Sequence, residues 1–324
     1  MDQIKHLIIS GYTQLNQGIE KRDIELVENS VGNYTTAIEM LYSLNDVRSE
    51  RIQRILAVAH NNRARGLMSL QKYIDAIDDY TKALELGFED TDLYHNRGAA
   101  FKELGELNKA LEDFERAIGV GHENPISYYN RGQVFLGLNM YTEALNDFEK
   151  AKRLGIEEPA IYSLLGSTYM KTGKLEEAYE SFTAALRLGE RQDFIYRLRS
   201  EVLRDLRRPM EALEDISRAI NISPEPVYFH LRGVYYFMLK QYEDAVENFS
   251  NAIRLDSKRP EAFLNRGLAL SKMDKHLEAL QDFLKTLELG LETPIVYASM
   301  AAAYQNIGDN KRAMDNILKA KSLE

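Results

Sequence analysis

Residues 125–158 read PISYYNRGQVFLGLNMYTEALNDFEKAKRLGIEE, and this stretch of 34 residues decides the fold because the chain repeats its pattern. The spacing is 34 throughout, except for a single 33, and segments with this pattern begin at Ala57, Thr91, Pro125, Pro159, Asp193, Pro226, Pro260 and Pro294. A fixed period of this length is typical of a structural unit that stacks on copies of itself. The repeat therefore predicts one elongated array rather than two compact domains.

Three positions of the unit keep their character in every copy. The eighth position is small, as Ala64, Gly98, Gly132, Gly166, Ser200, Gly233, Gly267 and Ala301. The twentieth is always alanine, as Ala76, Ala110, Ala144, Ala178, Ala212, Ala245, Ala279 and Ala313. The twenty-fourth is large and apolar, as Tyr80, Phe114, Phe148, Phe182, Ile216, Phe249, Phe283 and Ile317. Small residues let two helices approach closely, and we expect the large side chain to fill the space against the neighbouring unit.

This small–alanine–aromatic pattern resembles the tetratricopeptide repeat (TPR), a helix–turn–helix unit that stacks into a solenoid. The resemblance covers residues 57–324 and implies an all-α, right-handed superhelical solenoid of stacked antiparallel helix pairs, with about 18 helices. Residues 1–56 do not fit the frame. There we expect a divergent pair of helices, around residues 4–19 and 23–44, that caps the array. The alternative for this segment is a separate docking or DNA-binding element.

Local signals support two helices, A and B, in each unit. Helix A often opens with proline, and Asn124 and Thr293 stand one residue earlier, where an N-cap belongs. Pro209 marks the turn between A and B in the fifth unit, and glycine supplies that turn at Gly105, Gly173 and Gly308. Helix B is expected to end at a left-handed glycine, at Gly87, Gly121, Gly155, Gly189 and Gly290.

Arginine occupies the seventh position in six units, and those units carry a matching side chain at position twenty-three. The pairs are Arg63–Asp79, Arg97–Asp113, Arg131–Asp147, Arg199–Asp215, Arg232–Asn248 and Arg266–Asp282. The two units without the arginine, with Leu165 and Met300, carry Ser181 and Asn316 instead. This covariation predicts a structural ion pair between helices A and B of one unit.

The composition of the chain disfavours several classes of partner and of functional site. The chain has 41 basic and 50 acidic residues, a net charge of −9, which disfavours nucleic acid and anionic membrane as partners. It contains no cysteine, and it has no apolar run of the length that a membrane span needs. We find no catalytic motif and no metal-ligand spacing among the histidines. The sequence therefore predicts a cytoplasmic, non-enzymatic protein without metal or cofactor.

In the family that this chain resembles, helix A lines a concave groove that holds a peptide. Its groove positions imply that the ligand-binding residues here are Asn62, Arg65, His95, Asn96, Tyr129, Asn130, Gln133, Arg197, Arg204, His230, Phe237 and Asn265. Other groove positions carry Asn61, Lys102, Ser163, Ser167, Met170, Glu201, Val234, Leu264 and Ser271. Asn62, Asn96 and Asn130 recur at position six, like the asparagine ladder with which some family members hold an extended peptide backbone. The alternative is that Asn-Arg-Gly is simply a common helix-A sequence.

The lysine, asparagine and arginine positions with which chaperone-binding members clamp a terminal carboxylate are not matched here. We therefore expect a protein-binding scaffold that holds a segment across the first six units, with Arg197 and Arg204 favouring an acidic side chain. The alternatives are a bacterial signalling-peptide receptor and, less favoured, an RNA-binding repeat protein. Met314 and Leu318 lack a following helix to cover them, which predicts a homodimer through the C-terminal edge.

Overall fold

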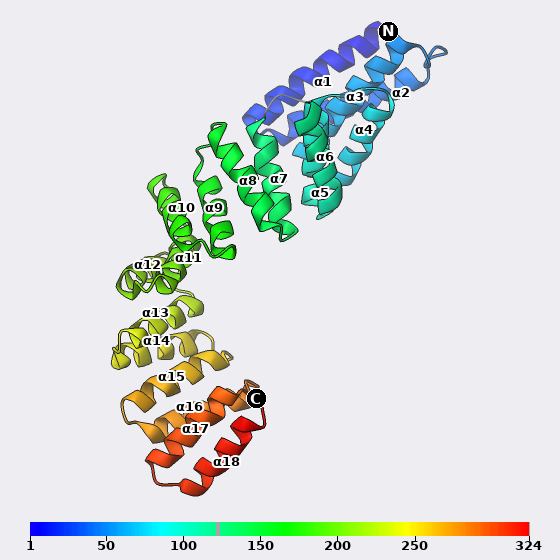
Figure 1. The fold of residues 1–324 in the computed structure, drawn as a ribbon. Helices are drawn as coiled ribbons and strands as arrows, with labels where there is room; N and C mark the ends of the chain where they lie inside the picture. The colour runs from blue at the N-terminus through cyan, green and yellow to red at the C-terminus, as the bar shows by residue number, and fades with distance from the viewer. Residues whose placement is uncertain (121–123, 324) are drawn as a thin grey trace. The chain divides into compact units, whose positions relative to one another are not determined.

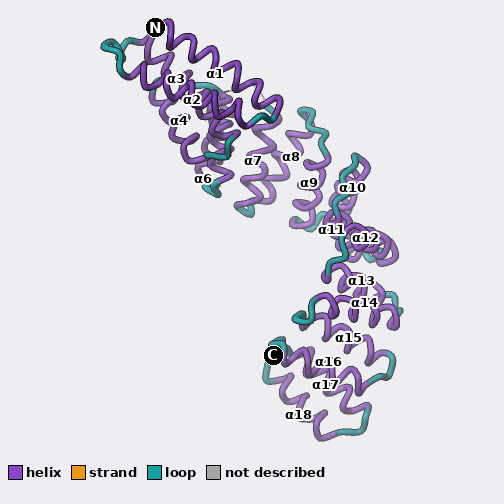
Figure 2. Tube along the Cα trace, turned by 180° about the vertical axis from the view of Figure 1, so that it is seen from behind, coloured by secondary structure: helices purple, strands orange, loops and turns teal. Residues whose placement is uncertain are grey.

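The computed structural model describes residues 1–120 and 124–323, and these residues form 18 α-helices and no strand (Figures 1 and 2). The prediction of an all-α repeat protein is confirmed. The expected helix end at Gly121 lies outside the described residues. The helices are α1 (Asp2–Lys21), α2 (Ile24–Tyr42), α3 (Glu50–Ser69), α4 (Tyr73–Glu85), α5 (Thr91–Glu103), α6 (Leu107–Val120), α7 (Pro125–Gly137), α8 (Tyr141–Arg153), α9 (Pro159–Lys171), α10 (Leu175–Arg187), α11 (Asp193–Asp205), α12 (Pro209–Ile222), α13 (Pro226–Met238), α14 (Tyr242–Leu255), α15 (Pro260–Lys272), α16 (His276–Glu288), α17 (Pro294–Asn306) and α18 (Asn310–Lys321).

The chain divides into two compact units, Met1–Glu157 with α1–α8 and Glu158–Glu324 with α9–α18. Within each unit, every helix A packs on the helix B that follows it, and helix B packs on the next helix A. This division was not expected, because the 34-residue pattern continues through it unchanged. No described helix combines the length and the apolar character that a membrane span requires.

Helix boundaries follow the repeat frame closely, with one exception. Seven helices begin at the first residue of a repeat, namely at Thr91, Pro125, Pro159, Asp193, Pro226, Pro260 and Pro294. The exception is α3, which begins at Glu50, about two turns before Ala57. The expected boundary after residue 56 therefore falls inside a helix. The N-terminal pair α1 and α2 matches the expected ranges to within a few residues.

In the five repeats that carry glycine at position eight, the glycine and the large residue of the same repeat meet. A Cβ added to Gly132 would lie 2.7 Å from Cε1 of Phe148, and one added to Gly166 would lie 2.7 Å from Cε1 of Phe182. Phe148 and Phe182 are fully buried. The aromatic also packs against the next repeat, as expected, since Phe114 shares a core cluster with Val134 and Phe182 with Ile195.

Two local predictions need correction. Pro209 does not form the turn between α11 and α12; it is the first residue of α12, and Arg207 takes the left-handed conformation with φ of 61°. Asn124 caps α7 by accepting a hydrogen bond from the Ile126 amide, whereas the Thr293 side chain makes no such bond at the start of α17. The turn glycines Gly105, Gly173 and Gly308 all have positive φ, as expected.

The predicted ion pairs are present. Arg199 shows their form: its Nε donates to Oδ2 of Asp215 at 2.6 Å and its Nη2 donates to Oδ1 at 2.7 Å. Arg63, Arg97, Arg131 and Arg266 make the same two-pronged contact, while Arg232 donates through Nε to Asn248. Each forked pair joins α-helices A and B of one repeat, which confirms the covariation argument.

A third contact extends these pairs to the preceding repeat. The remaining Nη1 of Arg199 donates to Thr183 on α10 at 3.0 Å, and Arg97 reaches Thr81 on α4 in the same way at 3.1 Å. Arg63 and Arg266 bond Thr35 and Ser250 through the equivalent nitrogen. Each of these arginines therefore links its own helix A to helix B of the same repeat and to helix B of the preceding one, which was not predicted from the sequence.

Candidate functional site

The first cluster of predicted site residues lies on the A helices α5 and α7. Lys102 on α5 donates from Nζ to Oδ1 of Asn130 at 3.1 Å and to Oε1 of Gln133 at 2.6 Å. Nε2 of His95 lies 3.4 Å from Nδ2 of Asn130, and Nδ1 of His95 lies 3.0 Å from the hydroxyl of Ser127. The two helices thus share a continuous polar network, which we call the α5–α7 network (His95, Lys102, Ser127, Asn130 and Gln133).

Burial sets the charge state of this network. Desolvation lowers the pKa of His95 below its ordinary value of 6.5; the nearby Asp92 opposes this shift, and Lys102 adds a still smaller lowering effect. A neutral His95 accepts from the Asn130 amide through Nε2, which leaves Nδ1 to donate to Ser127. Burial also lowers the pKa of Lys102. The ring of His95 packs edge-on against the ring of Phe114, with centroids 5.5 Å apart, and this contact holds the imidazole in position.

The second unit repeats part of this arrangement on α13 and α15. Nε2 of His230 lies 3.2 Å from Nδ2 of Asn265, and the His230 ring packs on Phe249 at 5.5 Å. Burial lowers the pKa of His230, as it does for His95. A cavity of about 130 Å³ adjoins this pair, and it is lined by Val234, Phe237, Phe249, Asn265 and Leu268. Polar and apolar groups that could hold a ligand therefore lie side by side.

Among the described residues, both pairs leave hydrogen-bonding capacity unused. Asn265 uses one N–H toward His230, which leaves its second N–H and its carbonyl oxygen. Asn130 keeps one N–H and one lone pair after its bonds to His95 and Lys102. One donor beside one acceptor is what the amide of an extended peptide requires.

The other predicted site residues take three different positions. Asn62 is only 7% exposed and accepts from Arg65 at 3.4 Å, so its amide faces the protein rather than a ligand; its place at the start of an open ladder was wrong. Asn96 is half-buried on α5, next to the α5–α7 network. Tyr129 lies over Phe148, with centroids 6.1 Å apart.

The two predicted arginines already have acidic partners. Arg197 pairs with Glu201 one turn along α11, and Arg204 donates from Nε to Asp205 at 2.8 Å. The hydrogen bond to Asp205 raises the pKa of Arg204. A ligand carboxylate at these arginines would therefore compete with Glu201 and Asp205, and the expectation of an acidic ligand side chain there stays a prediction.

Sequence reasoning missed two features of this surface. Ser127 was not among the predicted groove residues, although it bonds His95. It was also not predicted that Lys102 donates to the side-chain amides of both Asn130 and Gln133. A signal was present: in both clusters the histidine and its asparagine are separated by 35 residues, which is position five of one repeat and position six of the next.

Comparison with known proteins agrees with the geometry. Family models described as "Tetratricopeptide repeat" match residues 95–159 and 159–189, and one described as "TPR repeat" matches residues 233–274. No curated protein sequence matches the chain. The structure is similar to YrrB, a TPR protein described as having an unusual peptide-binding site, with 23% identity, 57% of this chain and 96% of that chain covered, and a TM-score of 0.52.

Two further solved structures are similar over different shares of the chain. A tetratricopeptide repeat protein from Parabacteroides merdae is 19% identical, with 83% of this chain and 100% of that chain covered and a TM-score of 0.53. The pilF protein of Pseudomonas aeruginosa is also 19% identical, with 61% and 91% covered and a TM-score of 0.52. At such identities the likeness establishes the fold alone. The family models identify tetratricopeptide repeats over residues 95–189 and 233–274, and the same 34-residue frame continues through the rest of residues 57–324.

Proposed function

We propose that this protein is a non-enzymatic interaction scaffold that binds an extended peptide segment of a protein partner on its A helices. The observation that carries the proposal is the α5–α7 network, in which Asn130 is held between His95 and Lys102 with one N–H and one lone pair to spare. Side chains held by packing and hydrogen bonds bind a ligand without first losing rotamer freedom. The repeat-family fold supports the same role, because such folds bury their core by stacking and leave the A helices available.

The His230–Asn265 pair gives the second unit a related but distinct site. Here the polar pair adjoins the cavity lined by Phe237 and Leu268, which suits an apolar side chain of a bound segment. Peptide binding by the structurally similar YrrB makes this use of the fold reasonable. A signalling-peptide receptor would use the same surface, and the experiment below distinguishes it by the kind of peptide selected.

The test starts from selection. Peptides selected from a random display library on the immobilised protein are synthesised, and their affinity is measured by fluorescence anisotropy. Each polar anchor contributes about 0.5–1.5 kcal/mol, so the double variant Asn96→Ala with Asn130→Ala should weaken binding by about 1–3 kcal/mol, roughly five- to 150-fold. Asn221→Ala serves as the control, because this asparagine is exposed at the end of α12.

Recognition of the peptide backbone is tested on the same selected peptides. Methylation of individual backbone nitrogens should abolish binding at the positions that face Asn130, while alanine substitution of neighbouring peptide side chains is tolerated. Unchanged affinity of the double variant, with helical content intact by circular dichroism, would refute the proposed site. A selected set that shares one strict side-chain motif would instead favour a dedicated signalling-peptide receptor.

A further inference from the structure

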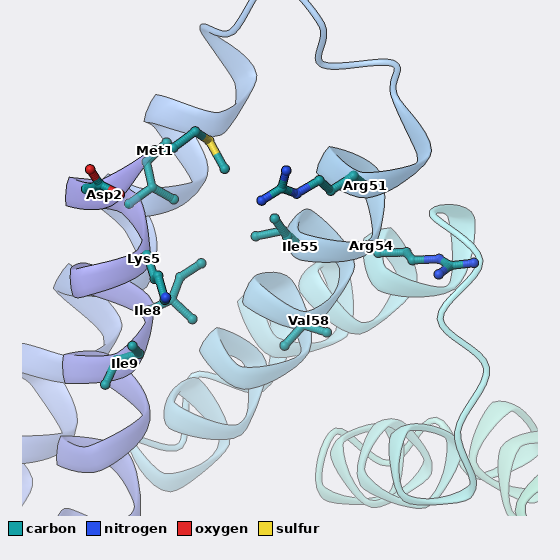
Figure 3. A pocket seen from close by; sticks show the side chains of 10 residues that line it. Met1, Asp2, Lys5, Ile8, Ile9, Arg51, Arg54, Ile55 and Val58 are labelled. Carbon is teal, nitrogen blue, oxygen red and sulfur yellow. The ribbon is translucent and has the colours of Figure 1, made fainter.

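A groove of about 590 Å³ lies between the N-terminal halves of α1 and α3, outside the A-helix sites described above (Figure 3). Its apolar lining comes from both helices and consists of Met1, Ile4, Ile8, Ile9, Ile55 and Val58. Ile8 and Ile55 point into the space between the two helices (Figure 3). Ile9 and Val58 are 57% and 38% exposed, so the groove offers apolar surface that the described chain does not cover.

The groove exists because α3 is longer than a repeat requires. Residues 50–56 add about two turns before the first repeat, and α1 lies across the groove from them. On α3 the lining residues are spaced by three or four, from Arg51 through Ile55 to Val58, and those of α1 follow the same spacing from Lys5 to Ile9. Each wall is therefore one face of a helix. Two facing apolar walls of this length match two to three turns of a third helix.

Positive charge borders the apolar lining. In the part of the chain that the structure describes, Lys5 and Arg51 have no ion-pair partner, and Arg51 extends into the groove in Figure 3. Arg54 turns away and pairs with Glu50 at 2.5 Å, and Asp2 is the single acidic lining residue. The protein as a whole is acidic, with a net charge of −9, so this basic rim is a local feature.

We propose that the α1–α3 groove binds an amphipathic helix of a protein partner, with an apolar face that enters the groove and acidic residues that flank it. The apolar face would cover Ile9 and Val58, and the acidic flank would pair with Lys5 and Arg51. The N-terminal pair would then be a docking element as well as a cap.

Charge argues against this chain's own last helix as the occupant. Met314 and Leu318 of α18 are exposed and apolar, at 57% and 60%, which would suit the groove. However, α18 carries four basic residues against Asp315, namely Lys311, Arg312, Lys319 and Lys321. A basic helix facing Lys5 and Arg51 is repelled, whereas an acidic helix is attracted.

The test uses two synthetic peptides of about 18 residues with leucine at the same helical spacing. One carries glutamate at the remaining positions and the other carries lysine. Fluorescence anisotropy with the full chain should show binding of the glutamate peptide only. The double variant Lys5→Glu with Arg51→Glu should lose at least tenfold affinity for the glutamate peptide and gain affinity for the lysine peptide. Arg191→Glu with Lys258→Glu, at an exposed loop arginine and an exposed turn lysine, makes the same change in charge elsewhere and should change neither affinity.

Apolar contact is tested separately. Ile9→Gln with Val58→Gln should weaken binding at least fivefold, whereas Ile74→Gln with Leu277→Gln, at residues that are each 66% exposed elsewhere, should leave it unchanged. Equal affinity for the glutamate and the lysine peptide overturns the proposal. So does an equal loss of affinity in the Ile9/Val58 variant and the Ile74/Leu277 variant. So does a dimer in sedimentation velocity that Ile9→Gln dissociates, because the occupant is then a second copy. The Asn96→Ala and Asn130→Ala variant should bind the glutamate peptide normally, which separates this site from the proposed function.

Discussion

The Arg199–Asp215 pair allows a quantitative test of what holds each repeat together. The guanidinium contacts both oxygens of Asp215, at 2.6 and 2.7 Å, and bonds Thr183 as well. The two side chains are only 13% and 3% exposed. Asp215→Ala leaves the guanidinium buried without its counter-charge, which costs about 3–5 kcal/mol, and the residual exposure of Arg199 places the expected loss near 3 kcal/mol. An exposed pair would lose only about 0.2–1 kcal/mol.

The chain itself supplies the matched variants. Asp215→Asn copies the sixth repeat, where Arg232 donates to Asn248 at 2.7 Å, and it should cost about 1–2 kcal/mol because one good acceptor remains. Arg199→Met with Asp215→Asn copies the last repeat, which carries Met300 and Asn316. This double variant removes the buried charge, so it should be more stable than Asp215→Ala despite its two substitutions.

Hydrogen exchange followed by mass spectrometry provides the assay, because it reports the opening free energy of α11 and α12 separately from the rest of the array. Guanidinium unfolding followed by circular dichroism gives the global value. The reasoning is refuted by a loss below 1 kcal/mol for Asp215→Ala, which would make the pair no stronger than a surface contact. It is also refuted if the double variant is the least stable of the three.

Three further predictions concern packing, pH and assembly. Gly132→Ala should cost about 1–3 kcal/mol in unfolding, because its Cβ would lie 2.7 Å from Phe148, while Gly32→Ala, with nothing within 4 Å, should stabilise α2 by about 0.5–1 kcal/mol. Burial lowers the pKa of His95 and His230 below 6.5, so the unfolded chain binds more protons than the folded chain as the pH falls below that value. The melting temperature should therefore decrease between about pH 7.5 and 5.5. The decrease should be smaller in the double variant His95→Gln with His230→Gln. If the exposed Met314 and Leu318 form a homodimer, Met314→Glu with Leu318→Glu should yield a monomer in sedimentation velocity, and a wild-type protein that is monomeric at high concentration would contradict that assembly.

Contacts inside one repeat were predictable from the sequence. Arg199 and Asp215 are 16 residues apart, as are the other forked pairs, and eight copies of the unit reveal which positions vary together. The first residue of helix A was equally clear, because a proline at that position costs no hydrogen bond. The candidate site was predictable only as a set of positions. Its network depends on whether the side chains of adjacent repeats reach one another, as His95 and Asn130 do.

The amino-acid sequence by itself determined the repeat, the all-α fold and the residues that join helices A and B, because those interactions recur at a constant separation along the chain. Only the tertiary structure decided that Asn62 is buried, that Arg197 and Arg204 are already paired, and that an extended α3 opens a groove beside α1. These outcomes depend on how far each side chain reaches and on which neighbours it meets, and those distances are not encoded in a repeat pattern.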